Sequence, residues 1–205
     1  MAIPENRFAF LLRKPRHCLD AEFYQSARSF WDMDDEMWHY LLDLVPKGRT
    51  PYGRRVRGVL KQLSPGLARY FLIRWLDGEW GSEGMEGLCT SPDWLEVRSE
   101  MVAAFKELGA ERHAAMIETL PALVERAQQA STEGEQDALL PVFKRLDRQW
   151  ANLAKKEDLE KMLFQSVKAD WTPYLHPPKP QQVAPPNRRP PRLVAVRRPG
   201  KGGGR

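Results

Sequence analysis

The stretch that decides the fold is residues 51–76, PYGRRVRGVLKQLSPGLARYFLIRWL. This stretch contains two segments, and each begins with a proline that follows a hydroxyl residue: Pro51 follows Thr50, and Pro65 follows Ser64. A hydroxyl at the N-cap can accept a backbone N–H, and proline at the first helical position gives up no helical hydrogen bond. The apolar residues that follow recur every three or four positions: Val56, Val59, Leu60 and Leu63, then Leu67, Tyr70, Phe71 and Trp75. This spacing predicts two consecutive amphipathic helices.

The same periodicity extends to both sides of this stretch. Residues 37–45 repeat it behind Asp34 and Asp35, which suit a helix N-terminus. Gly109 is expected to separate two helices, and Pro121 and Pro141 to kink or split the helices that contain them. The further helices are expected over 92–108, 110–126, 135–155 and 157–169, and the one plausible short strand over 7–12. The sequence therefore predicts an all-α protein, a compact multi-helix bundle.

The C-terminal segment has a different composition. The chain of 205 residues carries 32 Lys and Arg against 27 Asp and Glu, a net charge of +5. Residues 177–205 hold eight of the basic residues, no acidic residue and eight of the 17 prolines. Such a segment cannot bury enough apolar surface to offset its ordering entropy. We therefore expect a helical domain at 1–176, with a net charge of −3, and a disordered basic Pro/Gly-rich tail at 177–205.

The composition also indicates the cellular compartment of the protein. The apolar runs are a few residues long, far short of the roughly 20 that a membrane helix needs. The N-terminal apolar run is too brief for a signal peptide. Two cysteines, Cys18 and Cys89, do not imply a disulfide framework. We expect a cytoplasmic protein without a membrane segment.

No motif for catalysis or for metal binding is found in the sequence. The four histidines lie far apart, without metal-ligand spacing to Cys or carboxylate. Phosphate-loop, nucleophile-elbow and zinc-protease motifs are missing. The glycine-rich segment at 78–87 carries Glu79, Glu83 and Glu86 and no lysine, so it would repel a phosphate, and we expect it to form a tight acidic turn between helices. The sequence predicts no catalytic residue, cofactor or metal, and a protein that is not an enzyme.

The middle of the chain is strongly acidic. Residues 77–143 hold 14 acidic and 4 basic side chains, a net charge of −10. Seven-residue spacing, nearly two helical turns, places two rows of carboxylates on helix faces. The first acidic row is Asp93, Glu100 and Glu107, and the second is Glu111, Glu118 and Glu125. Few basic residues stand four positions away to compensate them.

We interpret the two rows as ridges that attract a basic protein surface, the alternative being an ordinary solvated helix face. The candidate partner-binding residues are Asp77, Glu79, Glu83, Glu86, Asp93, Glu96, Glu100, Glu107, Glu111, Glu118 and Glu125.

A basic pole precedes the acidic block, with no acidic residue between Asp43 and Asp77. It could contact phosphate, although it lacks the interleaved aromatics that stack on bases. It could equally pair with the acidic block of a neighbouring subunit. The candidate phosphate-binding residues are Arg54, Arg55, Arg57 and Lys61, together with Arg188, Arg189, Arg192, Arg197 and Arg198 of the tail.

Three segments resemble, in order, those of a bacterial domain family of unknown function whose best-known member is a DNA mimic. Residues 76–85, LDGEWGSEGM, resemble its L-x-G-E-V-N-N-G-G-F core motif. Residues 105–110 are similar to its helix junction, and LDRQW at 146–150 with EDL at 157–159 to its closing segment. The resemblance covers about residues 55–172.

The resemblance implies an all-helical, dimeric protein that presents carboxylates to a DNA-binding protein where DNA phosphates would be. We therefore expect a non-enzymatic interaction module with a basic protein partner, and a homodimer. The alternative is a nucleic-acid-associated adaptor that uses the tail and the Arg54, Arg55 and Arg57 patch. The tail could also serve as a solubility arm, as a proline-recognition ligand, or as a segment that folds back onto the acidic ridges.

Overall fold

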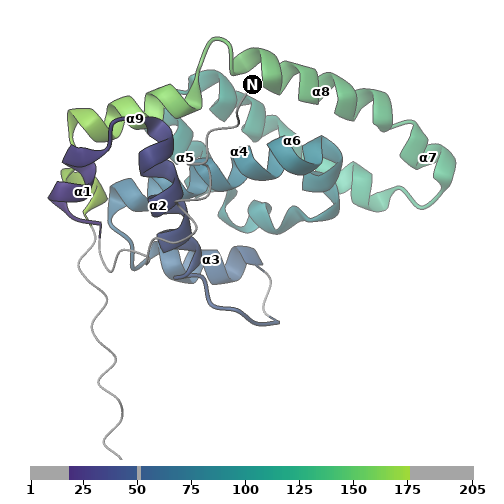
Figure 1. The fold of residues 1–205 in the computed structure, drawn as a ribbon. Coiled ribbons are helices and arrows are strands. Elements are labelled where there is room, and N and C mark those ends of the chain that lie inside the picture. The colour runs from purple at the N-terminus through teal and green to yellow at the C-terminus, as the bar shows by residue number, and fades with distance from the viewer. Residues whose placement is uncertain (1–18, 50–51, 176–205) are drawn as a thin grey trace, which may run out of the picture.

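The computed structural model describes residues 19–49 and 52–175, and these residues form an all-α fold (Figure 1). No β-strand is found among them, which confirms the expected class. The expected strand at 7–12 and the expected tail at 177–205 lie outside the described residues. The elements are α1 (Ala21–Ser26), α2 (Phe30–Leu42), α3 (Tyr52–Leu60), α4 (Pro65–Thr90), the 3₁₀ turn η2 (Pro92–Val97), α5 (Arg98–Leu108), α6 (Glu111–Gln129), α7 (Glu133–Asp137), α8 (Leu140–Leu153), α9 (Leu159–Ala169) and the 3₁₀ turn η3 (Thr172–Tyr174).

The central helix, α4, begins at the predicted proline. Pro65 stands in its first turn and Ser64 is its N-cap residue, whose carbonyl accepts the N–H of Ala68 at 2.9 Å. The Ser64 hydroxyl makes no capping bond. The helix α3 is capped instead from a distant element, because the N–H of Tyr52 donates to Asp93 Oδ2 of η2 at 2.7 Å.

The prediction of a tight acidic turn at 78–87 is wrong. The helix α4 continues through this segment to Thr90 and changes direction only at Gly84, whose φ of 67° and ψ of −168° are non-helical. Gly78 and Gly81 stay helical and face open space. A polar glycine-rich sequence therefore continues a helix here, because its apolar residues Trp80, Met85 and Leu88 are buried against the rest of the core.

Several other expected boundaries shift. The helix expected at 92–108 is divided into η2 and α5, and the one expected at 135–155 into α7 and α8, with Pro141 in the first turn of α8. Gly109 ends α5 in the left-handed conformation, with φ of 86°, as predicted. Pro121 lies inside α6, which continues past it to Gln129.

The core gathers around α4, which lies in the middle of the fold (Figure 1). Leu67, Ile73 and Leu76 of this helix are fully buried. The helices α1, α2 and α9 lie at one end of α4, and α7 lies at the opposite end of the molecule (Figure 1). This layout places the first and last described residues, Leu19 and Leu175, beside α1 and away from α7.

Candidate functional site

The first and third family-like segments meet at one carboxylate. Asp147 of α8 accepts two hydrogen bonds on Oδ1, from Trp80 Nε1 at 2.9 Å and from the backbone N–H of Met85 at 2.8 Å. The rings of Trp80 and Trp150 stack at 4.0 Å between centroids. A Cβ at Gly84 would stand 3.3 Å from Asp147 Oδ2, so the carboxylate lies directly against the kink of α4.

A second carboxylate, that of Asp77 in the family-like core motif, lies in a polar network inside the bundle. Asp77 accepts from Trp150 Nε1 at 3.3 Å and from Arg74 Nη1 at 3.2 Å. Arg74 also forms a two-pronged ion pair with Asp34 of α2, at 2.7 and 3.0 Å. The Tyr70 hydroxyl donates to the same Asp34, and burial followed by the charge of Asp34 raises the pKa of Tyr70 well above its usual range. Asp77 therefore joins α2, α4 and α8.

The third family-like segment reaches the start of α6, just after the second segment, through Glu157, which caps the N-terminus of this helix. Its carboxylate accepts the N–H groups of Arg112 at 3.0 Å and His113 at 3.1 Å, and His113 Nδ1 donates to it at 2.7 Å. The N-cap residue, Ala110, has no side chain that could do this. Burial raises the pKa of Glu157, but these hydrogen bonds outweigh it and hold the pKa below its usual value.

The first acidic row is neutralised inside the chain. Glu100 pairs with Arg57 at 3.3 Å, and Glu107 with Arg69 at 3.7 Å. Asp93 accepts the N–H of Tyr52, as described above, and lies in η2, so the row does not follow one straight α-helix. The basic pole and the first acidic row thus face each other within one chain, in a contact that we name the charge seam and that also includes Arg54 with Glu96 at 3.6 Å.

The second acidic row lies on the exposed face of α6. Glu111, Glu118 and Glu125 are all exposed. Glu118 pairs with Lys106 of α5 at 2.8 Å, and its hydrogen bond and charge raise the pKa of Lys106. In the described part of the chain no basic side chain lies within ion-pair distance of Glu111 or Glu125. Two of the three carboxylates in this row therefore form no ion pair with the described residues, although Glu125 accepts a hydrogen bond from Gln129 Nε2 at 3.4 Å.

Further free carboxylates surround a groove that we name the α7 groove. It has a volume of about 400 Å³ and lies between the end of α4, the end of α6 and the α7–α8 junction. Glu86 of α4 and Asp137 of α7 line it, and no basic side chain does. Its other lining residues are Cys89, Thr90, Ala127, Gln128, Gln136, Leu139, Leu140 and Phe143.

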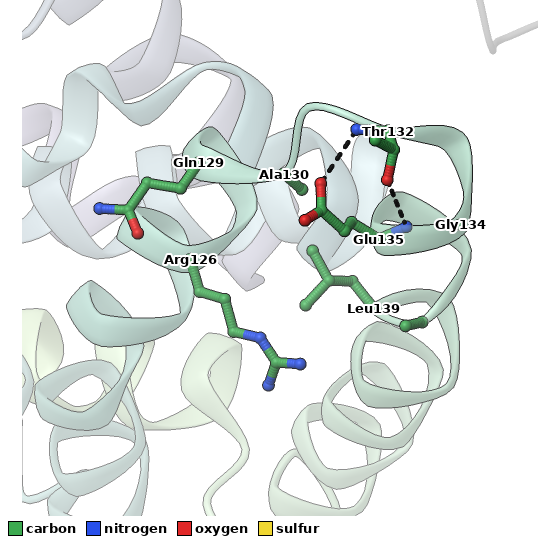
Figure 2. A pocket seen from close by; sticks show the side chains of 8 residues that line it. Arg126, Gln129, Ala130, Thr132, Gly134, Glu135 and Leu139 are labelled. Atoms are coloured by element: carbon green, nitrogen blue, oxygen red, sulfur yellow. Dashed lines mark hydrogen bonds between the residues drawn. The ribbon is translucent and has the colours of Figure 1, made fainter.

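A neighbouring pocket of about 510 Å³ lies between the end of α6 and α7 (Figure 2). Glu135 lies on one side, where it accepts the N–H of Thr132 at 3.0 Å and of Ser131 at 2.9 Å. Arg126 extends toward this pocket from α6 (Figure 2). Because the Glu135 carboxylate is occupied by its capping box, this pocket offers fewer free acidic groups than the α7 groove.

The remaining acidic residues that were predicted to bind a partner include both half-buried and exposed side chains. Glu79 is half-buried beside Tyr52, where its charge adds to burial in raising the pKa of the Tyr52 hydroxyl. Glu83 and Glu86 are exposed near the end of α4. Two exposed carboxylates of α7, Glu133 and Asp137, belong to the same end of the molecule and were not among the predicted partner-binding residues. We name Glu83, Glu86, Glu111, Glu125, Glu133 and Asp137 the free acidic set.

The predicted phosphate-binding arginines are occupied within the chain. Arg54 and Arg57 belong to the charge seam, and Arg55 donates to the Pro46 carbonyl at 2.7 Å while its guanidinium lies over the Tyr52 ring. Lys61 is exposed just after α3, without a hydrogen bond or ion pair to the residues that the structure describes. Arg188, Arg189, Arg192, Arg197 and Arg198 lie outside the described residues.

The described residues contain no group of three or more His, Cys, Asp or Glu that could hold a metal ion. Cys89 is buried, and burial raises the pKa of its thiol to about 11, so the thiolate that a nucleophile requires is scarce at neutral pH. Within residues 19–49 and 52–175, no helix is both long enough and apolar enough to span a bilayer. The expected cytoplasmic location and homodimer stay predictions.

Fold and site together define an all-α domain in which internal carboxylates hold the bundle together and further carboxylates stay exposed at one end. The family model of the DMP19-like proteins matches residues 61–170, more than half of the chain, so the chain belongs to this family. The resemblance to a DNA-mimic type of domain is thereby confirmed, and the family is not one of enzymes. No curated protein and no solved structure matches the chain.

Proposed function

We propose that this chain is a non-enzymatic interaction module that binds the basic, DNA-contacting surface of a DNA-binding protein through its free acidic set. The observation that carries the proposal is the division among the carboxylates. Glu100 and Glu107 of the first row pair with arginines of the same chain, whereas the six carboxylates of the free acidic set form no ion pair with the described residues. Unpaired surface carboxylates favour a basic partner through their summed field.

The family supports the same direction, because a DNA-mimic type of domain works by offering carboxylates in place of phosphates. The partner surface is then one that DNA itself occupies. Binding should weaken as salt rises, since exposed charges are screened over a Debye length of about 8 Å at physiological ionic strength. Duplex DNA should compete with the chain for the partner.

The test captures partners from lysate on the immobilised full chain and identifies those that duplex DNA displaces. Changing Glu83, Glu86, Glu125 and Asp137 together to the corresponding amides should reduce capture of these partners at least tenfold. The matched control changes the paired residues Glu96, Glu100 and Glu107 to Gln and should retain capture. Equal capture by both variants, or partners that DNA does not displace, would contradict the proposal.

A further inference from the structure

The α7 groove combines an apolar floor with carboxylates on two sides. Leu139, Phe143 and Cys89 form the buried floor, and Ala127 and Leu140 are half-buried at its edges. Glu86 stands on the α4 side and Asp137 on the α7 side. Such a groove suits an extended segment with apolar side chains in its centre and a positive charge at each end.

The helix α7 itself has little packing of its own. None of its five residues is buried, and its start is fixed by the capping box between Thr132 and Glu135. The first buried side chain after it is Leu139, which also lines the groove. A segment seated in the groove would therefore cover the least packed helix of the described fold.

The chain contains one segment of this description in its acid-free C-terminal part, residues 192–198, which read RLVAVRR. Four apolar residues stand between Arg192 and the pair Arg197 and Arg198. We propose that this segment, which we name the RLVAVRR segment, docks in the α7 groove of its own chain. Its apolar residues would contact Leu139, Leu140 and Phe143, and its arginines would pair with Glu86 and Asp137. The proposal does not rest on the proposed function.

Chain length allows this occupant and disfavours the other candidate. The described chain ends at Leu175, and the neighbouring Tyr174 carbonyl accepts from the Tyr24 hydroxyl of α1 at 2.7 Å, so the first and last described residues, Leu19 and Leu175, lie at α1, opposite α7 (Figure 1). The 18 residues from Leu175 to Leu193 span up to about 60 Å, more than the roughly 40 Å diameter of a compact domain of this size. The apolar run at 8–12 also lies between cations, but Phe8 is 11 residues before Leu19 and reaches at most about 36 Å.

Docking within one chain requires only weak contacts. A connection of this length gives an effective concentration in the millimolar range. A segment with a dissociation constant well below a millimolar therefore occupies the groove most of the time. The arginine–carboxylate contacts lie at the rim and are screened by salt, so occupancy should fall as ionic strength rises.

The test places a photocrosslinking benzoyl-phenylalanine at position 194 of the otherwise unchanged full chain. Irradiation should attach it to residues 86–90, 127–128 or 136–143, as read by mass spectrometry of the digested protein. In an equal mixture of isotopically light and heavy chains the adducts should stay within one chain. The same probe at position 183, outside the RLVAVRR segment, is the control and should give at least fivefold fewer groove adducts.

Charge reversal then checks the proposed recognition. Changing Glu86 and Asp137 to Lys should lower the groove adducts from position 194 at least fivefold. The matched variant, with Glu22 and Glu36 of α1 and α2 changed to Lys, should leave them unchanged. Adducts from position 194 outside the groove, adducts between chains, no adducts, or equal yields from both charge variants would overturn the proposal.

Discussion

Gly84 has a backbone conformation that is essentially restricted to glycine. Its φ of 67° with ψ of −168° lies in a region where any side chain is strained. Asp147 stabilises this geometry from outside, because it accepts the N–H of Met85, directly after the kink, and the indole N–H of Trp80, one turn before it. One carboxylate and one glycine therefore set the direction in which α4 continues.

We predict opposite effects for substitutions among the glycines of α4. Gly84→Ala should reduce the free energy of unfolding by about 2–3 kcal/mol, because alanine is strained at this conformation. Gly78→Ala and Gly81→Ala should each increase it by about 0.5–1 kcal/mol, because both glycines are helical and face open space. Urea unfolding followed by circular dichroism measures all three. A Gly84→Ala variant as stable as the wild type would show that the kink is not constrained.

The four glycines at 78–87 also show where sequence reasoning was insufficient. Their spacing and acidic neighbours are typical of a turn, and nothing local distinguishes Gly84 from Gly78 or Gly81. The distinction comes from Asp147, more than 60 residues away, which contacts only one of them. Local signals did predict the start of α4 at Pro65 and the end of α5 at Gly109, since both depend on residues next to them.

At the scale of elements, two helices begin at caps supplied by side chains distant in sequence, whereas α1, α2, α7 and α9 are capped by their own N-cap residues. Glu157 caps α6, and Asp93 caps α3, although neither residue belongs to the helix that it caps. Heptad spacing identified Asp93 as part of an acidic ridge, but the segment is a 3₁₀ turn and its carboxylate is used internally. The all-α class and most helices were predictable from periodicity, whereas the role of each carboxylate depended on tertiary contacts.

We predict that Glu157 makes stability dependent on acid pH. Its pKa in the folded state is lowered, so its contribution is present above the unfolded value of 4.5 and is lost as pH falls through the folded value. Glu157→Gln should therefore cost about 1 kcal/mol of unfolding free energy at pH 7, from the loss of a cap acceptor, and much less at pH 3. Urea titrations at a series of pH values measure this difference.

The control for this prediction is Glu133→Gln. Glu133 is exposed at the start of α7, and its carboxylate makes no hydrogen bond to the described residues. Its substitution should change stability by less than about 0.5 kcal/mol at either pH. A cost of Glu157→Gln that stays constant from pH 7 to pH 3 would mean that the Glu157 charge does not stabilise α6.

At the scale of the whole molecule, the sequence alternates between charge blocks that the fold brings together. Residues 1–76 carry a net +5 and residues 77–143 a net −10. The charge seam joins the two blocks through α3 and the η2–α5 segment, and it uses Arg54 and Arg57, two of the residues that were predicted to bind phosphate. The excess of acidic residues in the second block then stays at the opposite side, on α6, α7 and the end of α4. The net charge of each block could be predicted from the sequence. Which arginine pairs with which glutamate could not, because the paired residues are about 40 positions apart.

We predict that the charge seam behaves as a coupled pair of opposite charges. Arg57 and Glu100 stand 3.3 Å apart with side chains 44% and 40% exposed, so their coupling energy should be about 0.5 kcal/mol. In a double-mutant cycle at low salt, Arg57→Glu and Glu100→Arg should each destabilise the protein, and their combination should recover most of the loss. The coupling should disappear near 1 M salt, where the Debye length is about 3 Å.

The control is the pair Lys61→Glu and Glu125→Lys, two residues that share no contact, and the effects of these two substitutions should be additive. Additive effects at Arg57 and Glu100 as well, in urea unfolding at low salt, would mean that the two charge blocks do not neutralise each other across α3 and α5.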